Sequence, residues 1–204
     1  MHQRWDGQQP LTVLEIRADG IPPARFIQLF QHFEDLMPRF TKDLKCQSLP
    51  PVNGFRTIHQ RIEMPILMSN RSLFTTYYDI DGLQPGEYQF ISSSWGNEAY
   101  QLKYSKLAGR DVIAQLNLNY IGIRPVKNAQ NEITGTHVQQ VQSVSMNGMI
   151  PDMYMTKHSK RSAMQIINMI TFLQTTTEEL CRCKRHYGWE QKYQPLLKLV
   201  SPHE

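Results

Sequence analysis

The residue types that could hold a metal ion gather near the end of the chain. Cys181, Cys183 and His186 stand in the run CRCKRH, and thiolates with an imidazole are ligands that zinc prefers. A structural zinc site needs four ligands, however, and no second pair of matching spacing accompanies this run. We therefore expect free thiols here and no metal site.

Catalytic chemistry has equally little support in the sequence. His59 could act as a base, but no serine or cysteine nucleophile motif accompanies it. The chain also lacks a G-x-G-x-x-G run, a phosphate-binding loop and a G-x-S-x-G elbow. We therefore expect no enzymatic activity and no cofactor, and we interpret His59 as a structural or pocket-lining residue.

Several polar residues share a face with apolar ones in segments that alternate like strands. Arg61 and Glu63 share a face with His59, while Gln140 and Gln142 share a face with Val138, Val144 and Met146. A buried polar side chain must be hydrogen-bonded or must contact a ligand. Two interpretations stay open: one of these faces lines a cavity and fixes the polar end of a ligand, or the glutamines point to solvent.

These side chains must be positioned by a mostly β structure. Residues 11–17 alternate as a strand, and Pro22-Pro23 opens a helix whose apolar stripe runs to Met37, before Pro38. Turn residues such as Asp81-Gly82 and Pro85-Gly86 separate the later strands, with no helix expected between them. The further strands are expected at residues 55–64, 72–80, 87–94, 111–124 and 136–146. Short connections of this kind favour a meandering antiparallel sheet.

The last element is a long helix expected at about residues 151–180. Ala163, Ile166, Ile167, Ile170 and Leu173 follow helical spacing. At about 1.5 Å per residue the helix is long enough to lie across a whole sheet. The sequence therefore predicts an α+β helix-grip fold, in which a curved antiparallel sheet packs on a long C-terminal helix.

Composition indicates one domain. The 204 residues include 40% hydrophobic and 20% charged ones, and we expect a polar leader at 1–10, a domain at 11–180 and a basic tail at 181–204. No apolar run approaches the roughly 18 residues of a membrane span. The polar first residues and an odd number of cysteines favour a cytoplasmic location with reduced thiols.

The formal net charge of +4 is concentrated in the tail. Residues 181–204 hold five basic and two acidic residues, a net charge of +3. Such a tail suits an anionic membrane surface or an acidic partner, and it is equally compatible with a merely solvated end. Basic residues do not alternate with the strand aromatics, so we expect no nucleic-acid partner.

Three blocks of sequence together resemble the START family, the lipid-transfer domains related to steroidogenic acute regulatory protein, within the Bet v 1-like class. The blocks are 59–65 leading into 68–72, 109–112, and 144–151. The resemblance covers about residues 11–180. Asn70-Arg71-Ser72 departs from the family's proline-arginine-aspartate step, and Ser145 stands where an aspartate is common. The positions that correspond to the acid–arginine pair of sterol-binding members fall near Ile58 and Tyr77, which are uncharged.

The resemblance implies a hydrophobic cavity between the sheet and the long helix that holds one lipid-sized molecule. Strand parity and helix spacing then select candidate ligand-binding residues: His59, Arg61, Glu63, Tyr77, Leu116, Leu118, Tyr120, Gln142, Val144, Met146, Met153, Ile166 and Ile170. Methionines around the last helix could adapt to a flexible chain.

The expected function is binding, and transfer, of a lipid or similar hydrophobic molecule without catalysis. Transient contact with an anionic membrane would be helped by the tail and by Lys157, Lys160 and Arg161. Two alternatives are a Bet v 1-like enzyme acting on a hydrophobic substrate and a protein-interaction module with a collapsed cavity.

Overall fold

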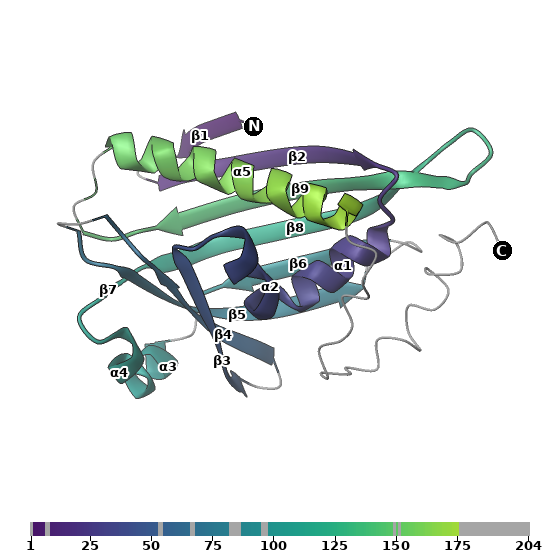
Figure 1. Cartoon of the computed structure of the whole chain (residues 1–204). Coiled ribbons are helices and arrows are strands. Elements are labelled where there is room, and N and C mark those ends of the chain that lie inside the picture. Colours follow the sequence, from purple (N-terminus) through teal and green to yellow (C-terminus); the bar gives the residue numbers. More distant parts are fainter. Residues whose placement is uncertain are drawn as a thin grey trace.

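The computed structural model describes residues 2–6, 9–52, 55–65, 68–81, 87–94, 98–148, 150 and 152–175. A curved sheet forms one layer, and a long helix lies across it (Figure 1). The strands are β1 (His2–Asp6), β2 (Gln9–Asp19), β3 (Leu44–Val52), β4 (Phe55–Ile62), β5 (Arg71–Asp81), β6 (Tyr88–Ser93), β7 (Val112–Ile113), β8 (Gln115–Lys127) and β9 (Ile133–Ser145). The helices are α1 (Pro23–Gln31), α2 (Phe33–Phe40), α3 (Glu98–Lys103), α4 (Ser105–Ala108) and α5 (Asp152–Thr175).

The sheet is antiparallel along its main path, in the order β1-β2-β9-β8-β6-β5-β4-β3, and the short β7 pairs in parallel with β5. β3 lies at one end of this order and contains Pro50-Pro51. Proline donates no ladder hydrogen bond, so it is tolerated in an edge strand. At the other edge, part of the segment expected as a leader forms β1, which pairs with β2.

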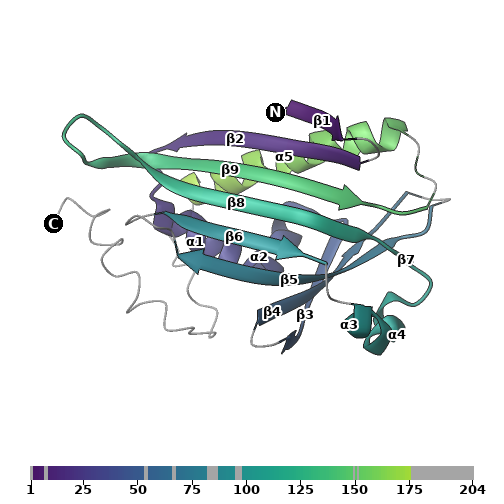
Figure 2. The same cartoon turned by 180° about the vertical axis from the view of Figure 1, so that it is seen from behind.

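The helices cover the sheet unequally. α5, α1 and α2 lie on its concave face, and the sheet stands in front of them when the molecule is seen from behind (Figures 1 and 2). The main core joins α1, the sheet and the end of α5 through fully buried side chains that include Ile27, Leu29, Phe90, Ile123 and Leu173. α3 and α4 instead pack on the convex face, where Ala108 and Tyr104 meet Leu49 and Phe74.

Two expectations about helices were wrong. The single helix expected after Pro22 is broken at His32, and its second half, α2, ends two residues after Pro38 rather than before it. Two short helices, α3 and α4, lie between β6 and β8, where none was expected. They supply a cover for the convex face.

The predicted α+β helix-grip architecture is confirmed: the curved antiparallel sheet grips α5, which has 24 residues. The part of the expected final helix beyond Thr175, and the basic tail at 181–204, lie outside the described residues. Within the described ranges, no helix is long and apolar enough to cross a bilayer.

Candidate functional site: a pocket under the long helix

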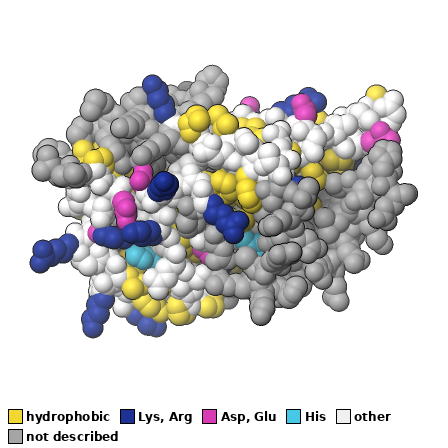
Figure 3. Space-filling view, viewed as in Figure 1, with side chains coloured by type: hydrophobic (Ala, Val, Ile, Leu, Met, Phe, Trp, Pro, Cys, Tyr) yellow, Lys and Arg dark blue, Asp and Glu magenta, His cyan; other side chains and the backbone are white. Residues whose placement is uncertain are grey.

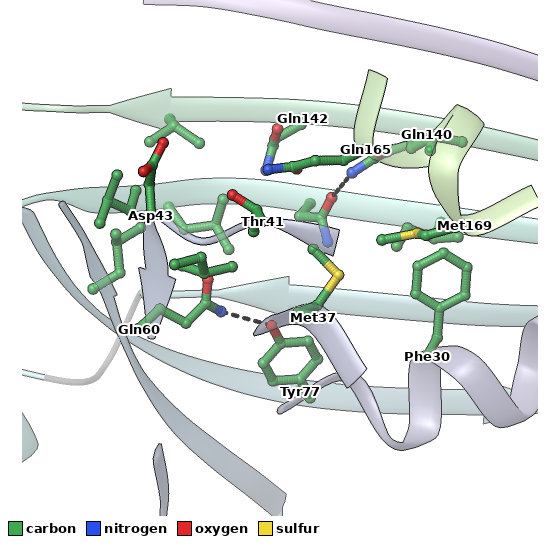
Figure 4. Close-up of a pocket in the computed structure, with 18 of the residues that line it drawn as sticks. Phe30, Met37, Thr41, Asp43, Gln60, Tyr77, Gln140, Gln142, Gln165 and Met169 are labelled. Carbon is green, nitrogen blue, oxygen red and sulfur yellow. Dashed lines mark hydrogen bonds between the residues drawn. The ribbon is translucent and has the colours of Figure 1, made fainter. Parts of the chain in front are cut away.

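A pocket lies between the concave face of the sheet, α2 and α5 (Figure 4). Its volume is about 140 Å³. Its lining comes from eight elements, the loop after α2 and the turn after β9: Phe30, Met37, Thr41, Asp43, Leu44, Gln60, Ile62, Leu73, Tyr77, Leu116, Asn119, Ile121, Gln140, Gln142, Val144, Met146, Gln165, Ile166 and Met169. Pockets that hold small molecules are typically about 300–1,000 Å³. A lipid-sized molecule therefore requires the elements over this pocket to move outward.

A β-bulge in β8 decides which residues of that strand face the pocket. Leu116 is opposite Val144, but Leu118 is already opposite Ser143, so Asn117 is the extra residue. A bulge of one residue exchanges the two faces of the strand beyond it. Asn119 and Ile121 therefore line the pocket, while Leu118 is 38% exposed on the convex face.

Polar side chains form a belt across the middle of the pocket. The Nε2 amide of Gln60 donates to the hydroxyl of Tyr77 (2.7 Å), and that of Gln140 donates to Oδ1 of Asn119 (2.8 Å). Asn119 in turn donates to the hydroxyl of Ser92 (3.1 Å). These bonds offset much of the cost of placing amides on an apolar face.

Apolar residues lie on both sides of this polar belt. On one side, Leu73, Leu116 and Met146 belong to one buried cluster, with Ile62 and Val144 packed against it. On the other side, Met37, Ile121 and Met169 belong to the main core, with Phe30 and Ile166 packed against it. The pocket therefore has a polar centre between two apolar ends.

Two amides of the pocket are available to a ligand. Gln142 on β9 and Gln165 on α5 are half-buried, and Figure 4 shows them close to the middle of the pocket. Their side chains make no hydrogen bond to any residue within the described ranges. A half-buried amide gains free energy when it forms a hydrogen bond with a partner. A ligand with hydrogen-bonding atoms in this region would provide one.

The pocket carries little charge. Asp43 is the one charged residue among the lining residues that the structure describes. A buried ion pair lies behind the pocket wall: Arg56 donates to Glu34 (3.1 Å) and to the carbonyl of Phe30 (3.2 Å), with its guanidinium 4.6 Å from the centre of the Tyr77 ring. Burial raises the pKa of the Tyr77 hydroxyl, so this group stays a neutral hydrogen-bonding partner.

An outer groove of about 280 Å³ adjoins the pocket. It lies between the loop that follows α2 and the middle of α5, and it shares Thr41, Asp43 and Gln165 with the pocket. Lys42, Met164 and Asn168 complete its sides together with Phe40. The groove is therefore the place where a ligand could enter between α2 and α5.

The turn before α5 is fastened to the sheet by a buried arginine. Arg71, at the start of β5, donates to the carbonyls of Ser69, Met146 (2.8 Å) and Asn147 (3.1 Å). Asn147 and Gly148 follow with positive φ, which lets the chain reverse toward α5. The structure thus gives α5 a fixed attachment at its start.

The candidate residues from the sequence divide into two groups. The pocket lining includes Tyr77, Leu116, Gln142, Val144, Met146 and Ile166. His59, Arg61, Glu63, Leu118, Tyr120 and Ile170 are not among the lining residues. Leu118 and Tyr120 follow the bulge and face away, and Ile170 packs against the main core. The side chain of Met153 lies outside the described ones.

The placement of His59 and Arg61 corrects the expectation about β4. Gln60 and Ile62 line the pocket, so His59 and Arg61 lie on the convex face. Glu63 pairs with Lys45 instead of reaching the pocket. The convex face of β4 is itself covered by the segment around α4. Because both faces of the strand are therefore buried, the pattern of polar and apolar residues in β4 does not tell which face is concave.

His59 belongs to a buried hydrogen-bonded cluster on that convex face. Its Nε2 lies 3.0 Å from the Ser72 hydroxyl, which donates to Asp111 (3.1 Å), and Arg61 binds the same carboxylate at 2.6 and 3.2 Å. Because Ser72 gives its proton to Asp111, it accepts from His59, the reverse of what a serine nucleophile needs. The cluster fastens Asp111 to the sheet and has a structural role.

Sequence reasoning missed several residues of the pocket. Gln60 lies between Ile58 and Ile62 on one face of β4, which is the same signal that selected Gln140 and Gln142. Asn119 was hidden by the bulge, and Thr41 and Asp43 lie in a loop that has no periodic pattern. No group of three metal-ligating side chains occurs in the part of the chain that the structure describes, and Cys181, Cys183 and His186 lie outside it.

Several known structures have a similar architecture. The chain is similar to the lipid transfer and protein localization domain of human StarD13, with 13% identity, a TM-score of 0.63, and coverage of 82% of this chain and 79% of that one. Human STARD10 gives 13% identity, a TM-score of 0.63, and coverage of 97% and 74%. A STAR-related lipid transfer protein from Xanthomonas axonopodis gives 13% identity, a TM-score of 0.62, and coverage of 85% and 92%. No family model matches the chain, and no curated protein matches it in sequence. The likeness establishes the fold.

Proposed function

Because the chain has the fold of the StAR-related lipid-transfer domains, we propose that it binds a lipid or similar hydrophobic molecule in the pocket under α5 and carries it. The proposed action is non-catalytic and cytoplasmic, with transient contact to an anionic membrane. Among the similar structures, that of StarD13 is a lipid transfer and protein localization domain, and the bacterial one is a STAR-related lipid transfer protein. The pocket between sheet and helix supports the same action here.

The observation that carries the proposal is the polar belt between two apolar ends. Apolar parts of a ligand gain about 25 cal/mol for each Å² that they remove from water. The amides of Gln142 and Gln165 gain partners if the ligand has a hydroxyl, ester or amide group between those parts. We therefore propose a lipid whose polar group is uncharged and lies at the middle of the pocket.

The charge of the pocket supports an uncharged polar group. Neither lysine nor arginine occurs among the described lining residues, so a phosphate at the belt would meet Asp43 without a countercharge. Burying an unpaired charge is costly. Lys42 lines the outer groove beside Asp43, so the anionic part of a head group would find a countercharge there and not inside.

The proposal is tested by lipid uptake, measured by native mass spectrometry after incubation with mixed lipids. Ile166→Trp places a larger side chain in the pocket and is expected to abolish uptake. Ile167→Trp is the matched control, because Ile167 is 51% exposed on α5. Equal uptake by both variants, or none by the parent protein, would contradict the pocket as the lipid site and favour a collapsed cavity.

The polar contact is tested in the same assay by exchanging glutamines on the two faces of β9. Gln142→Leu removes one of the two amides proposed to bond the ligand and is expected to lower the uptake of hydroxyl- or amide-bearing lipids about ten-fold relative to a plain hydrocarbon. Gln139→Leu is the control, because Gln139 points to the other face and bonds Glu15. Preferential uptake of a phospholipid would contradict the uncharged polar group while leaving lipid binding intact.

A further inference from the structure

We propose that α3 and α4 form a docking surface for anionic lipid bilayers. This surface, the α3–α4 surface, consists of Leu102, Lys103, Lys106, Leu107 and Arg110. The proposal extends the proposed lipid carriage, because a carrier must meet a membrane to exchange its ligand. It is carried by exposure, charge and the way in which the segment is held.

Leu102 is the most exposed of the large hydrophobic side chains that the structure describes, at 81%. Leu107, on the next short helix, is also exposed, at 37%. An exposed leucine makes no contribution to the core, yet it gains free energy when it enters the apolar part of a bilayer. The two leucines could therefore enter the interface while the helices stay at the surface.

Basic residues stand close to these leucines in the sequence. Lys103, Lys106 and Arg110 are all exposed, and Figure 3 shows basic side chains standing out at the end of the molecule where α3 and α4 lie in Figure 1. The carboxylate of Asp111 is 7% exposed and bound by Arg61, so it does not cancel this charge at the surface. Glu98 is the other acidic residue in the sequence of the segment. Exposed basic side chains of this kind attract anionic lipids at about 1 kcal/mol each, a factor of about five in affinity.

The α3–α4 surface is held firmly from beneath. Ala108 packs with Leu49 and Phe74, and Arg61 binds both oxygens of Asp111. Because these contacts hold α4 on the convex face of the sheet, the exposed leucines do not fold back onto the protein. A surface that is already ordered loses little conformational entropy on binding.

The same segment is connected to the attachment of α5. β7 pairs with Arg71 and Ser72 of β5, and the Nδ2 amide of Asn147 donates to the carbonyl of Ile113 (2.8 Å). In both views α3, α4 and the first turn of α5 lie at the same end of the molecule (Figures 1 and 2). A bilayer bound at the α3–α4 surface would therefore lie near the turn that holds α5.

The test is sedimentation of the full chain with two kinds of vesicle, phosphatidylcholine alone and phosphatidylcholine mixed with phosphatidylserine. Lys106→Gln with Arg110→Gln is expected to lower binding to the anionic vesicles about 25-fold. Leu102→Gln is expected to lower it about ten-fold. The controls remove equal charge or a similar leucine elsewhere: Arg17→Gln with Lys127→Gln, and Leu118→Gln. Arg17 and Lys127 are exposed, and Leu118 is 38% exposed on β8.

The outcomes separate this proposal from lipid carriage. Loss of vesicle binding in the α3–α4 variants, with normal uptake of lipid from detergent solution and normal thermal unfolding, supports the docking surface. Equal loss in the control variants, unchanged binding in the α3–α4 variants, or no preference of the parent protein for anionic vesicles would overturn it. Vesicle binding without any lipid uptake would instead contradict the carriage proposal and leave the docking surface standing.

Discussion

Buried polar residues in this protein bind neighbours that lie far away in the sequence. Arg56 on β4 binds Glu34 of α2 and the carbonyl of Phe30, while its guanidinium faces Tyr77. The Glu34 side chain also accepts from Ser48 (3.2 Å). A buried charge is tolerated only with such partners. The wall behind the pocket is therefore fixed in position before any ligand arrives.

At this scale we expect His59 to make stability depend on pH. Burial lowers its pKa below the ordinary value of 6.5; Asp111 opposes this shift and Arg61 adds to it. Below about pH 6.5 the unfolded chain therefore binds a proton before the folded one does, and the free energy of unfolding falls as the pH decreases. The measurement is urea unfolding at a series of pH values from about 7.5 to about 5.

His59→Gln is expected to flatten this pH dependence. The control is His137→Gln, because His137 is a partly exposed residue of β9. A parent protein whose stability rises as the pH falls from 7 to 5.5, or a His59→Gln variant with the parent's slope, would contradict the prediction. The Asp111 carboxyl, whose pKa is lowered chiefly by its hydrogen bond from Arg61, loses its stabilising effect only in more acidic solution.

At the scale of the element, close approach between strands depends on one glycine of β9. A Cβ atom added to Gly135 would lie 2.6 Å from the carbonyl oxygen of Ala18 and 2.9 Å from the Cα of Asp19. Both atoms belong to the backbone of β2, so β2 and β9 would have to separate. A Cβ added to Gly122 on β8 would also lie 2.6 Å from another atom, but this is the hydroxyl of the Tyr120 side chain.

The same substitution to alanine is therefore expected to lower the free energy of unfolding by different amounts at the two glycines. Gly135→Ala is expected to lower the free energy of unfolding by about 2 kcal/mol, because backbone strain cannot be relieved by a side chain. Gly122→Ala is expected to cost less than about 1 kcal/mol, since Tyr120 can rotate away. Thermal or urea unfolding of both variants measures the difference. An equal loss of unfolding free energy in the two variants would show that the close approach of β2 and β9 does not determine the cost of the substitution.

At the scale of the whole molecule, the pocket brings together elements that are distant from one another in the sequence. Its lining comes from α1, α2, the five strands β3, β4, β5, β8 and β9, and α5. Entry through the groove between Lys42 and Met164 requires α5 to move relative to the loop after α2. Binding of a ligand is therefore coupled to the contacts that hold α5 against the loop after α2.

We expect a bound lipid to slow amide hydrogen exchange in residues 41–44 and 164–169, which lie on the two sides of the groove. Exchange in the hairpin of β8 and β9 is expected to stay constant. A ligand at 100 times its Kd would also stabilise the fold by about 2.7 kcal/mol. Protection confined to other regions would show that the ligand enters elsewhere.

The sequence by itself determined most of the strands, the long helix and their order. Alternation predicted β2, β4, β5, β6, β8 and β9 within a few residues, because burial on one side of a strand leaves a period of two in its sequence. It also indicated Tyr77, Leu116, Gln142, Val144, Met146 and Ile166, which the pocket brings together. Their role as ligand contacts stays a prediction.

Only the tertiary structure decided which face of each strand is concave. The cover of α3 and α4 buries the convex side of β4 and β5 as well, so His59 and Thr57 are buried on that side while Ile58 is buried on the other. The extra residue Asn117 then reverses the faces of β8. Alternation along a strand tells which residues share a face, and it depends on local spacing alone. Which of the two faces is concave depends on which helices pack on which side of the sheet. That choice is made by contacts between segments distant in the sequence, which a local pattern does not contain.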